Sequence, residues 1–131
     1  MINKIKTCIS PFLLRGIILI SIFILWSVPG FCNDSEVMII ELEGPINPGT
    51  ATFMARGLEE AGKRGDALVI IRLDTPGGLA SSMRTMVKAI MNSPIPVVVY
   101  VAPKGAGAAS AGVMITISAH IAAMAPGTNI G

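Results

Sequence analysis

Cysteine is scarce in this sequence, and its position excludes two kinds of small domain. The chain has 131 residues and two cysteines, Cys8 and Cys32, both within the first 32 positions. The remainder can therefore form neither a disulfide framework nor a cysteine-based metal site. We predict no metal and no cofactor, and a domain held together by its hydrophobic core alone.

Basic patches and aromatic residues are also lacking. Aromatics make up 5% of the chain, and three of its ten basic residues (Lys4, Lys6 and Arg15) lie in the first fifteen positions. The remainder carries seven basic and eight acidic residues. Because no basic segment is interleaved with aromatics, we expect no nucleic-acid partner.

Formal charge is absent from the last part of the chain. No Asp, Glu, Lys or Arg occurs between Gly105 and Gly131. One interpretation is a second transmembrane helix, but a buried core segment is favoured because the stretch contains several polar side chains. These are Ser110, Thr116, Ser118 and His120. The sequence stops without a closing helix, so we expect a domain that is incomplete at its C-terminus.

The first 32 residues have the pattern of a secretory signal. A basic segment precedes the 13-residue apolar run Gly16 to Val28, and Pro29-Gly30 follows it. A spanning helix needs ~20 apolar residues, so this run fits a signal better. We predict residues 1–32 as a signal peptide, with an uncleaved signal anchor as the alternative. The domain would then be membrane-associated and extracytoplasmic.

Apolar runs alternate with helical patterns in the rest of the chain. Three runs, 37–42, 67–73 and 96–101, are nearly continuous and predict strands buried on both faces of a parallel sheet. A further short apolar segment covers 120–124. Strands that alternate with helices predict an α/β fold with a mainly parallel sheet.

Three helices are predicted between these runs. The first covers about 50–63, with Thr50 as its N-cap, Gly65 as its C-cap and Phe53 on its buried face. The second runs from about Leu79 to Met91 with Ser82 on its outer face, and the third covers about 108–118.

Two stretches that follow strands could build a catalytic site. Asp74-Thr75-Pro76-Gly77-Gly78 follows the second strand, and Ser110 lies where the third strand region meets a helix. The carboxyl ends of parallel strands share one edge, so these stretches can face each other. Ser110 would be a nucleophile, and the amides of Gly77 or Gly78 and of Ala111 would form an oxyanion hole.

Structural interpretations of both stretches remain open. The diglycine segment is also typical of a generic turn, and a small-residue helix start is typical of close packing. A dinucleotide-binding loop is excluded on two grounds. Ser110 replaces the third glycine of Gly105-Ala-Gly-Ala-Ala-Ser110, and no acidic residue follows to bind a ribose.

Four longer segments together resemble a known family. They are Leu73-Asp-Thr-Pro-Gly-Gly-Leu79, Ser93-Pro-Ile-Pro-Val-Val-Val-Tyr-Val-Ala-Pro103, Gly105-Ala-Gly-Ala-Ala-Ser-Ala-Gly112 and Ala119-His-Ile-Ala-Ala-Met-Ala-Pro-Gly-Thr-Asn-Ile-Gly131. As a set they resemble the ClpP-like, crotonase-fold serine proteases of the NfeD (nodulation efficiency protein D) membrane-protein group. The resemblance covers residues 36–131.

The resemblance implies a ClpP/crotonase-like spiral of repeated β-β-α and β-α units, of which 36–131 is the N-terminal part. It implies a Ser–Lys dyad in which Ser110 matches the nucleophile. Gly78, favoured over Gly77, and Ala111 match the oxyanion donors. The general-base lysine of the family lies past Gly131.

Four other polar residues are further candidates for roles in the site. Lys104 and His120 are in-chain alternatives to the absent base, although each also has a structural interpretation. Arg72 and Asp74 are predicted to flank the cleft and to position backbone or substrate.

The resemblance implies a serine endopeptidase that cleaves apolar segments of membrane-associated proteins. Its substrate would be a peptide or protein, with a stomatin-like membrane protein as candidate partner, and a homo-oligomer is compatible with it. Two alternatives come from other classes. One is a catalytically inactive fragment or non-enzymatic membrane-associated module, and the other is a crotonase-type acyl-CoA enzyme.

Overall fold

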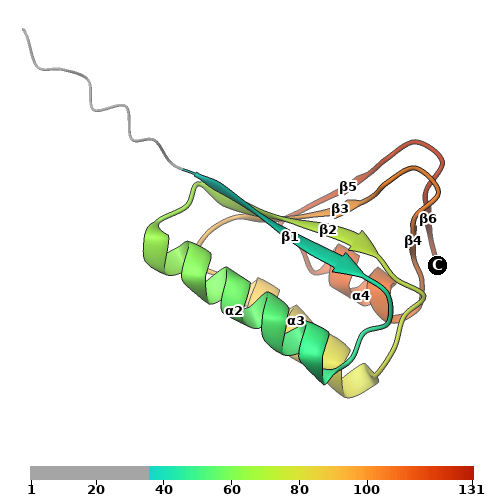
Figure 1. The fold of residues 1–131 in the computed structure, drawn as a ribbon, viewed down its shortest axis with the longest axis horizontal. Coiled ribbons are helices and arrows are strands. Elements are labelled where there is room, and N and C mark those ends of the chain that lie inside the picture. The colour runs from blue at the N-terminus through green and yellow to red at the C-terminus, as the bar shows by residue number, and fades with distance from the viewer. Residues whose placement is uncertain (1–35) are drawn as a thin grey trace, which may run out of the picture. The chain divides into compact units, whose positions relative to one another are not determined.

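A four-stranded parallel sheet organises the chain (Figure 1). The computed structural model describes residues 36–131, so the predicted signal peptide lies outside the described residues. The strands are β1 (Val37–Glu43), β2 (Leu68–Asp74), β3 (Val97–Val101) and β5 (Ile121–Met124), in the order β1-β2-β3-β5. The predicted α/β fold with a mainly parallel sheet is confirmed. Within 36–131 we find no helix with the length and apolar content that a membrane crossing requires.

The helices gather on one face of this sheet (Figure 1). They are α2 (Pro48–Arg64), α3 (Ala80–Met91) and α4 (Ala111–Ile117). Each connection moves the chain in the same direction across the sheet, and connections between parallel strands are almost always right-handed. All three crossovers therefore lie on the same side. Their core is formed by Ile40, Leu42, Val69, Ile71, Leu73, Val97, Val99 and Val101 from the strands, with Met54, Leu58, Met86, Ile90 and Ile115 from the helices.

The opposite face of the sheet is open in the described part of the chain. The register places Ile39, Ile70, Val98 and Ile121 in one row across the four strands. Ile39 is 61% exposed and Ile121 is 57% exposed. The prediction that the strands are buried on both faces is therefore wrong for residues 36–131. The strand order never reverses, so no crossover covers the second face.

Helix α2 is capped differently from the prediction. Asn47, rather than Thr50, is the N-cap: its Oδ1 accepts hydrogen bonds from the backbone N–H groups of Gly49 (2.9 Å) and Thr50 (3.0 Å). Thr50 Oγ1 in turn accepts from the Asn47 N–H at 3.0 Å, which completes a capping box. The prediction of Gly65 as the C-cap is confirmed, with φ 75° and ψ 34°.

Replacement of Asn47 by alanine tests this assignment. The Asn47→Ala change removes the acceptor for two helix N–H groups, so we expect the free energy of unfolding to fall by about 1 kcal/mol. Urea denaturation followed by circular dichroism measures the change. Asn92→Ala is the matched control, because the exposed Asn92 side chain makes no hydrogen bond to residues 36–131. Equal losses for the two variants would contradict the capping role.

The segment before Ser110 is a short strand rather than the start of a helix. Gly107–Ala108 (β4) pairs in parallel with Asn129–Ile130 (β6), and Ala108 also forms a bridge with Thr75. These pairings delay the start of α4 to Ala111, whereas the sequence predicted a helix from Ala108. The apolar segment 120–124 contains strand β5. Ser110 therefore lies directly between β4 and α4.

Candidate active site

Ser110 has an unusual backbone conformation. Its φ is 50° and its ψ is −106°, and no other non-glycine residue within 36–131 has a positive φ. Such a conformation costs of order 1–3 kcal/mol and persists only where the surroundings enforce it. Here the Ala109 N–H donates to the Thr75 carbonyl at 3.0 Å, and the Val113 N–H donates to the Ser110 carbonyl at 3.1 Å. Ser110 itself is exposed to solvent.

The diglycine turn lies against Ser110. A Cβ built on Gly77 would lie 2.9 Å from Ser110 Cβ and 3.1 Å from the Ala109 carbonyl oxygen. Gly77 has a φ of 104°, so its conformation also disfavours a side chain. Only glycine allows this close approach. The structure thus brings together Gly77, Gly78, Ser110 and Ala111, although Gly77 and Ser110 are 33 positions apart in sequence.

The two glycine amides have different partners. The buried Gly77 N–H donates to Thr75 Oγ1 at 3.0 Å and is therefore engaged. The Gly77 carbonyl accepts from the Ile46 N–H at 2.8 Å. Because the Gly77–Gly78 peptide is trans, the Gly78 N–H points away from Ile46. Gly78 is exposed, and this geometry leaves its amide available for a ligand.

Ser110 and Gly78 line the same small hollow. It has a volume of about 180 Å³ and is lined by Gly78, Ala80, Met83, Ser110, Ala111 and Met114. Ala111 is the first residue of α4, so its N–H has no acceptor within that helix. None of the lining residues is ionisable. The hollow therefore combines a hydroxyl, two candidate N–H donors and apolar walls.

His120 and Lys104, the two candidates for a general base within this chain, do not line this hollow. His120 Nδ1 accepts from the Val97 N–H at 3.1 Å, at the amino end of β3, whereas Ser110 follows the carboxyl ends of the strands. Lys104 lies beside Gly127, where a built Cβ would be 3.6 Å from Lys104 Cγ. Neither His120 nor Lys104 is therefore placed beside Ser110 as a general base.

Arg72 and Asp74 lie in different surroundings. Arg72 forms an ion pair with Glu41 at 3.0 Å, and the two residues are register partners on the open face of the sheet. Asp74 Oδ1 accepts from the Gly107 N–H at 3.0 Å. Asp74 therefore holds the backbone of β4, the strand that leads to Ser110, in agreement with the predicted positioning of backbone.

Two residues that hold the site were missed at the level of sequence. Thr75 engages the Gly77 amide through its hydroxyl, and the only signal in the sequence is a polar residue directly after a buried strand. Ile46 orients the Gly77–Gly78 peptide through its backbone N–H. A backbone contact of this kind leaves no side-chain signal.

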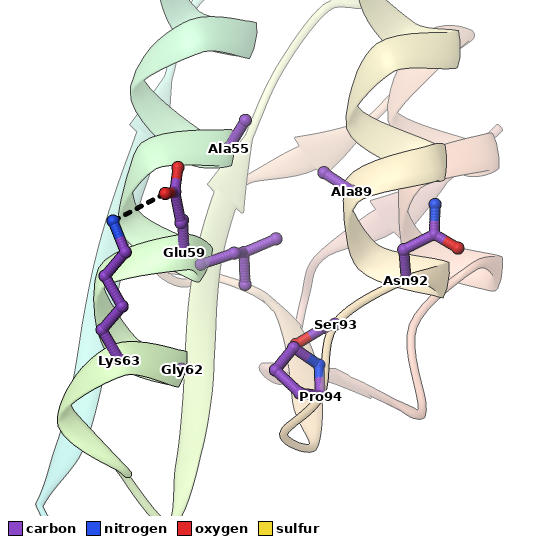
Figure 2. A pocket seen from close by; sticks show the side chains of 9 residues that line it. Ala55, Glu59, Gly62, Lys63, Ala89, Asn92, Ser93 and Pro94 are labelled. Atoms are coloured by element: carbon purple, nitrogen blue, oxygen red, sulfur yellow. Dashed lines mark ion pairs between the residues drawn. The ribbon is translucent and has the colours of Figure 1, made fainter.

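A second hollow, of about 380 Å³, lies between α2 and α3. Figure 2 shows Ala55, Glu59 and Lys63 on the α2 side, and Ala89, Asn92 and Pro94 on the other. Glu59 and Lys63 form an ion pair at 2.6 Å, and their hydrogen bond lowers the pKa of the Glu59 carboxyl. The Ser93 hydroxyl in this hollow donates to the Ile95 carbonyl at 2.8 Å. Because the Ser93 hydroxyl is already engaged in this bond, Ser110 is the better candidate nucleophile.

Comparisons with known proteins agree with this architecture. The family described as "NfeD1b, N-terminal domain" matches residues 36–131. The membrane-bound protease PH1510 of Pyrococcus horikoshii is 39% identical over 118 residues, which are 90% of this chain and 27% of that protein. Membrane protein NfeD1b of Bacillus subtilis is 35% identical over 99 residues, which are 76% of this chain and 22% of that protein. The chain thus spans about a quarter of the length of these relatives.

Solved structures show the same fold. The 1510-N membrane protease specific for a stomatin homolog from Pyrococcus horikoshii has a TM-score of 0.70 at 43% identity, over 74% of this chain and 49% of that one. ClpP1 from Listeria monocytogenes has a TM-score of 0.64 at 22% identity, over 69% of this chain and 52% of that one. At that identity the second likeness shows the fold alone, and the predicted ClpP-like fold is confirmed. The family match covers residues 36–131, and the Pyrococcus horikoshii relative aligns with 90% of this chain. The chain therefore belongs to the NfeD1b N-terminal domain family.

Proposed function

We propose that this chain carries the nucleophile and the oxyanion hole of a membrane-associated serine endopeptidase. The observation that carries the proposal is the placement of Ser110, in a strained conformation, in one hollow with the Gly78 and Ala111 amides. The name of the Pyrococcus horikoshii relative, a membrane-bound protease, supports the proposal. Solved forms of the Pyrococcus horikoshii protease include a serine-to-alanine mutant and a lysine-to-alanine mutant in complex with a substrate peptide.

In the proposed mechanism Ser110 Oγ attacks the carbonyl carbon of the scissile peptide bond and loses its proton to a general base. The carbonyl oxygen becomes an oxyanion, which accepts hydrogen bonds from the Gly78 and Ala111 N–H groups. The C–N bond then breaks, the leaving amine takes the proton, and an acyl-enzyme remains on Ser110. Water attacks this ester by the same route and restores the hydroxyl.

The general base in this proposal is a lysine beyond Gly131. No ionisable residue lines the hollow within the described residues, so none of them is placed to accept the Ser110 proton. Without a base a serine hydroxyl is only weakly nucleophilic. In this proposal the 131 residues supply half of a Ser–Lys dyad. A form of the protein that continues beyond Gly131 to this lysine, called the full-length protein below, supplies the other half.

The walls of the hollow favour an apolar substrate side chain. Met83 and Met114 line it together with alanine and glycine, and methionine adapts its shape to different apolar groups. One relative is named as specific for a stomatin homolog. We propose that the substrate is an apolar segment of a membrane-associated, stomatin-like protein, met on the extracytoplasmic side if residues 1–32 act as a signal.

Labelling with a fluorophosphonate probe tests the proposed function. In this reaction the Ser110 oxygen bonds to phosphorus, fluoride leaves, and the serine proton passes to the base. General-base assistance contributes about 10²- to 10⁴-fold, so we expect the full-length protein to label at least about 100-fold faster than the 131-residue chain. Mass spectrometry locates the label, with the Ser93 peptide as an internal control. A full-length protein that reacts at Ser93 as fast as at Ser110, or not at all, would refute the proposal.

A further inference from the structure

Thr75 links the two halves of the candidate oxyanion hole. It lies directly after β2, and its side chain is 2% exposed. A buried hydroxyl in this position needs hydrogen-bond partners. We propose that Thr75 is a positioning residue that sets the direction of the Gly78 amide and its distance from the Ala111 amide. This inference rests on the proposed function, because those amides matter only if an oxyanion forms between them.

The hydroxyl of Thr75 holds the diglycine turn. Thr75 Oγ1 accepts a hydrogen bond from the Gly77 N–H at 3.0 Å and donates to the Gly77 carbonyl at 3.3 Å. It thereby turns the Gly77 amide away from the hollow. Both glycines can adopt many backbone conformations, so the turn needs such an anchor to keep the Gly78 N–H in one direction.

The backbone of Thr75 holds the strand that delivers Ser110. Its N–H donates to the Gly107 carbonyl at 2.7 Å, and its carbonyl accepts from the Ala109 N–H at 3.0 Å. These two bonds enclose Ala108, which is the bridge partner of Thr75. The position of Ser110 relative to the turn is therefore set through the residue whose side chain orients the turn.

The methyl group of Thr75 contacts the helix behind Ser110. A Cβ built on Gly112 would lie 2.7 Å from Thr75 Cγ2, so α4 approaches this methyl as closely as a glycine allows. Ala111, the residue before Gly112, carries the second candidate donor. One side chain thus touches both the diglycine turn and the first turn of α4.

The Thr75→Val variant separates the hydroxyl from the shape of the side chain. Valine replaces the hydroxyl by a methyl group of similar size, which leaves the Gly77 N–H without its acceptor. A small displacement of a group that stabilises a transition state can cost about 100-fold in rate. We expect Thr75→Val to lower the fluorophosphonate labelling rate of the full-length protein by roughly 10- to 100-fold. We expect Thr75→Ser, which keeps the hydroxyl, to stay within about threefold of the unchanged protein.

Thr116→Val is the matched control. Thr116 is also 2% exposed, and its hydroxyl donates to the Gly112 carbonyl at 2.8 Å without contact to the diglycine turn. We expect this variant to lose stability but to keep the labelling rate. The pair Thr75→Ser and Thr75→Ala also compares a side chain with and without the hydroxyl, because both variants lack the methyl group. The result therefore does not depend on the folding of Thr75→Val alone.

A second measurement is independent of catalysis. Amide hydrogen exchange of Gly77, followed by NMR in the 131-residue chain, reports the bond to Thr75 directly. We expect exchange to become at least about tenfold faster in Thr75→Val and Thr75→Ala, and to be unchanged in Thr75→Ser. The inference is overturned if Thr75→Val labels at the unchanged rate, if the serine and alanine variants behave alike, or if Gly77 stays protected. An unchanged full-length protein that fails to label contradicts the proposed function instead, and Gly77 exchange still decides whether Thr75 orients the turn.

Discussion

The Gly78→Ala variant is expected to lose both the site and much of the stability of the fold. A Cβ on Gly78 would lie 2.1 Å from the Ile46 carbonyl oxygen and 2.6 Å from the Ile46 nitrogen. Both are backbone atoms, so no rotamer change relieves the overlap. The Ile46 segment would have to move, which breaks its bonds to the Gly77 carbonyl (2.8 Å) and the Leu79 N–H (2.9 Å). We expect the free energy of unfolding to fall by about 3 kcal/mol or more, with labelling of Ser110 lost.

Gly105→Ala is the control for this prediction. Gly105 also has a positive φ, 89°, but nothing lies within 4 Å of its built Cβ. The same substitution there adds backbone strain without a clash, which costs about 1 kcal/mol. Urea denaturation of the two variants side by side measures the difference. If Gly78→Ala costs no more than Gly105→Ala, then the close approach of Ile46 to the turn does not exist in solution.

Two substitutions at Ser110 are expected to abolish labelling yet to move stability differently. Ser110→Ala removes the nucleophile and keeps a side chain at a φ of 50°, so its strain remains. Ser110→Gly removes both. The strain is of order 1–3 kcal/mol, and glycine in the chain costs roughly 0.5–1 kcal/mol in backbone entropy. We therefore expect Ser110→Gly to be more stable than Ser110→Ala by about 1 kcal/mol.

Thermal and urea unfolding of the two variants check this prediction, with Ser118 as the control position. Ser118 ends α4 with φ −80° and ψ −10°, an ordinary right-handed conformation. At that position glycine should be less stable than alanine, the opposite order from Ser110. The same order at both positions would show that Ser110 is not strained in solution.

Helix spacing predicted the helices but misassigned several of their side chains, and Phe53 and Ser82 are two examples. Phe53 was predicted on the buried face of α2 and is 57% exposed. It lies beside β1, the edge strand, and no further strand within residues 36–131 extends the sheet on that side. Ser82 was predicted on the outer face of α3 and is 5% exposed. Helix α3 contacts both α2 and α4, so a wider sector of its surface is covered than for a helix with one neighbour. Spacing defines a face, whereas the neighbours decide how wide the buried sector is.

The sequence by itself determined the features that depend on local chemistry. Apolar runs and helical spacing predicted the parallel α/β architecture. Glycine is the residue type that most often ends a helix with a positive φ, and this predicted Gly65 as a C-cap. Ser110 was predicted at a strand–helix junction. The diglycine turn was expected to face Ser110, because parallel strands bring their carboxyl ends to one edge. The elements follow from propensities and periodicities within a few residues, and the approach of the turn to Ser110 follows from the parallel arrangement of the strands.

Only the tertiary structure decided which face of the sheet is open, what surrounds His120 and which contacts engage Gly77. Each depends on contacts between segments distant in sequence: Ile46 with Gly77, the crossovers with one side of the sheet, and His120 with Val97. A hydrogen bond between remote backbone groups depends on the direction of both chains, and local propensity carries no information about that direction. The family resemblance favoured Gly78 over Gly77, and the bonds of Gly77 to Ile46 and Thr75 supply a physical reason for that preference.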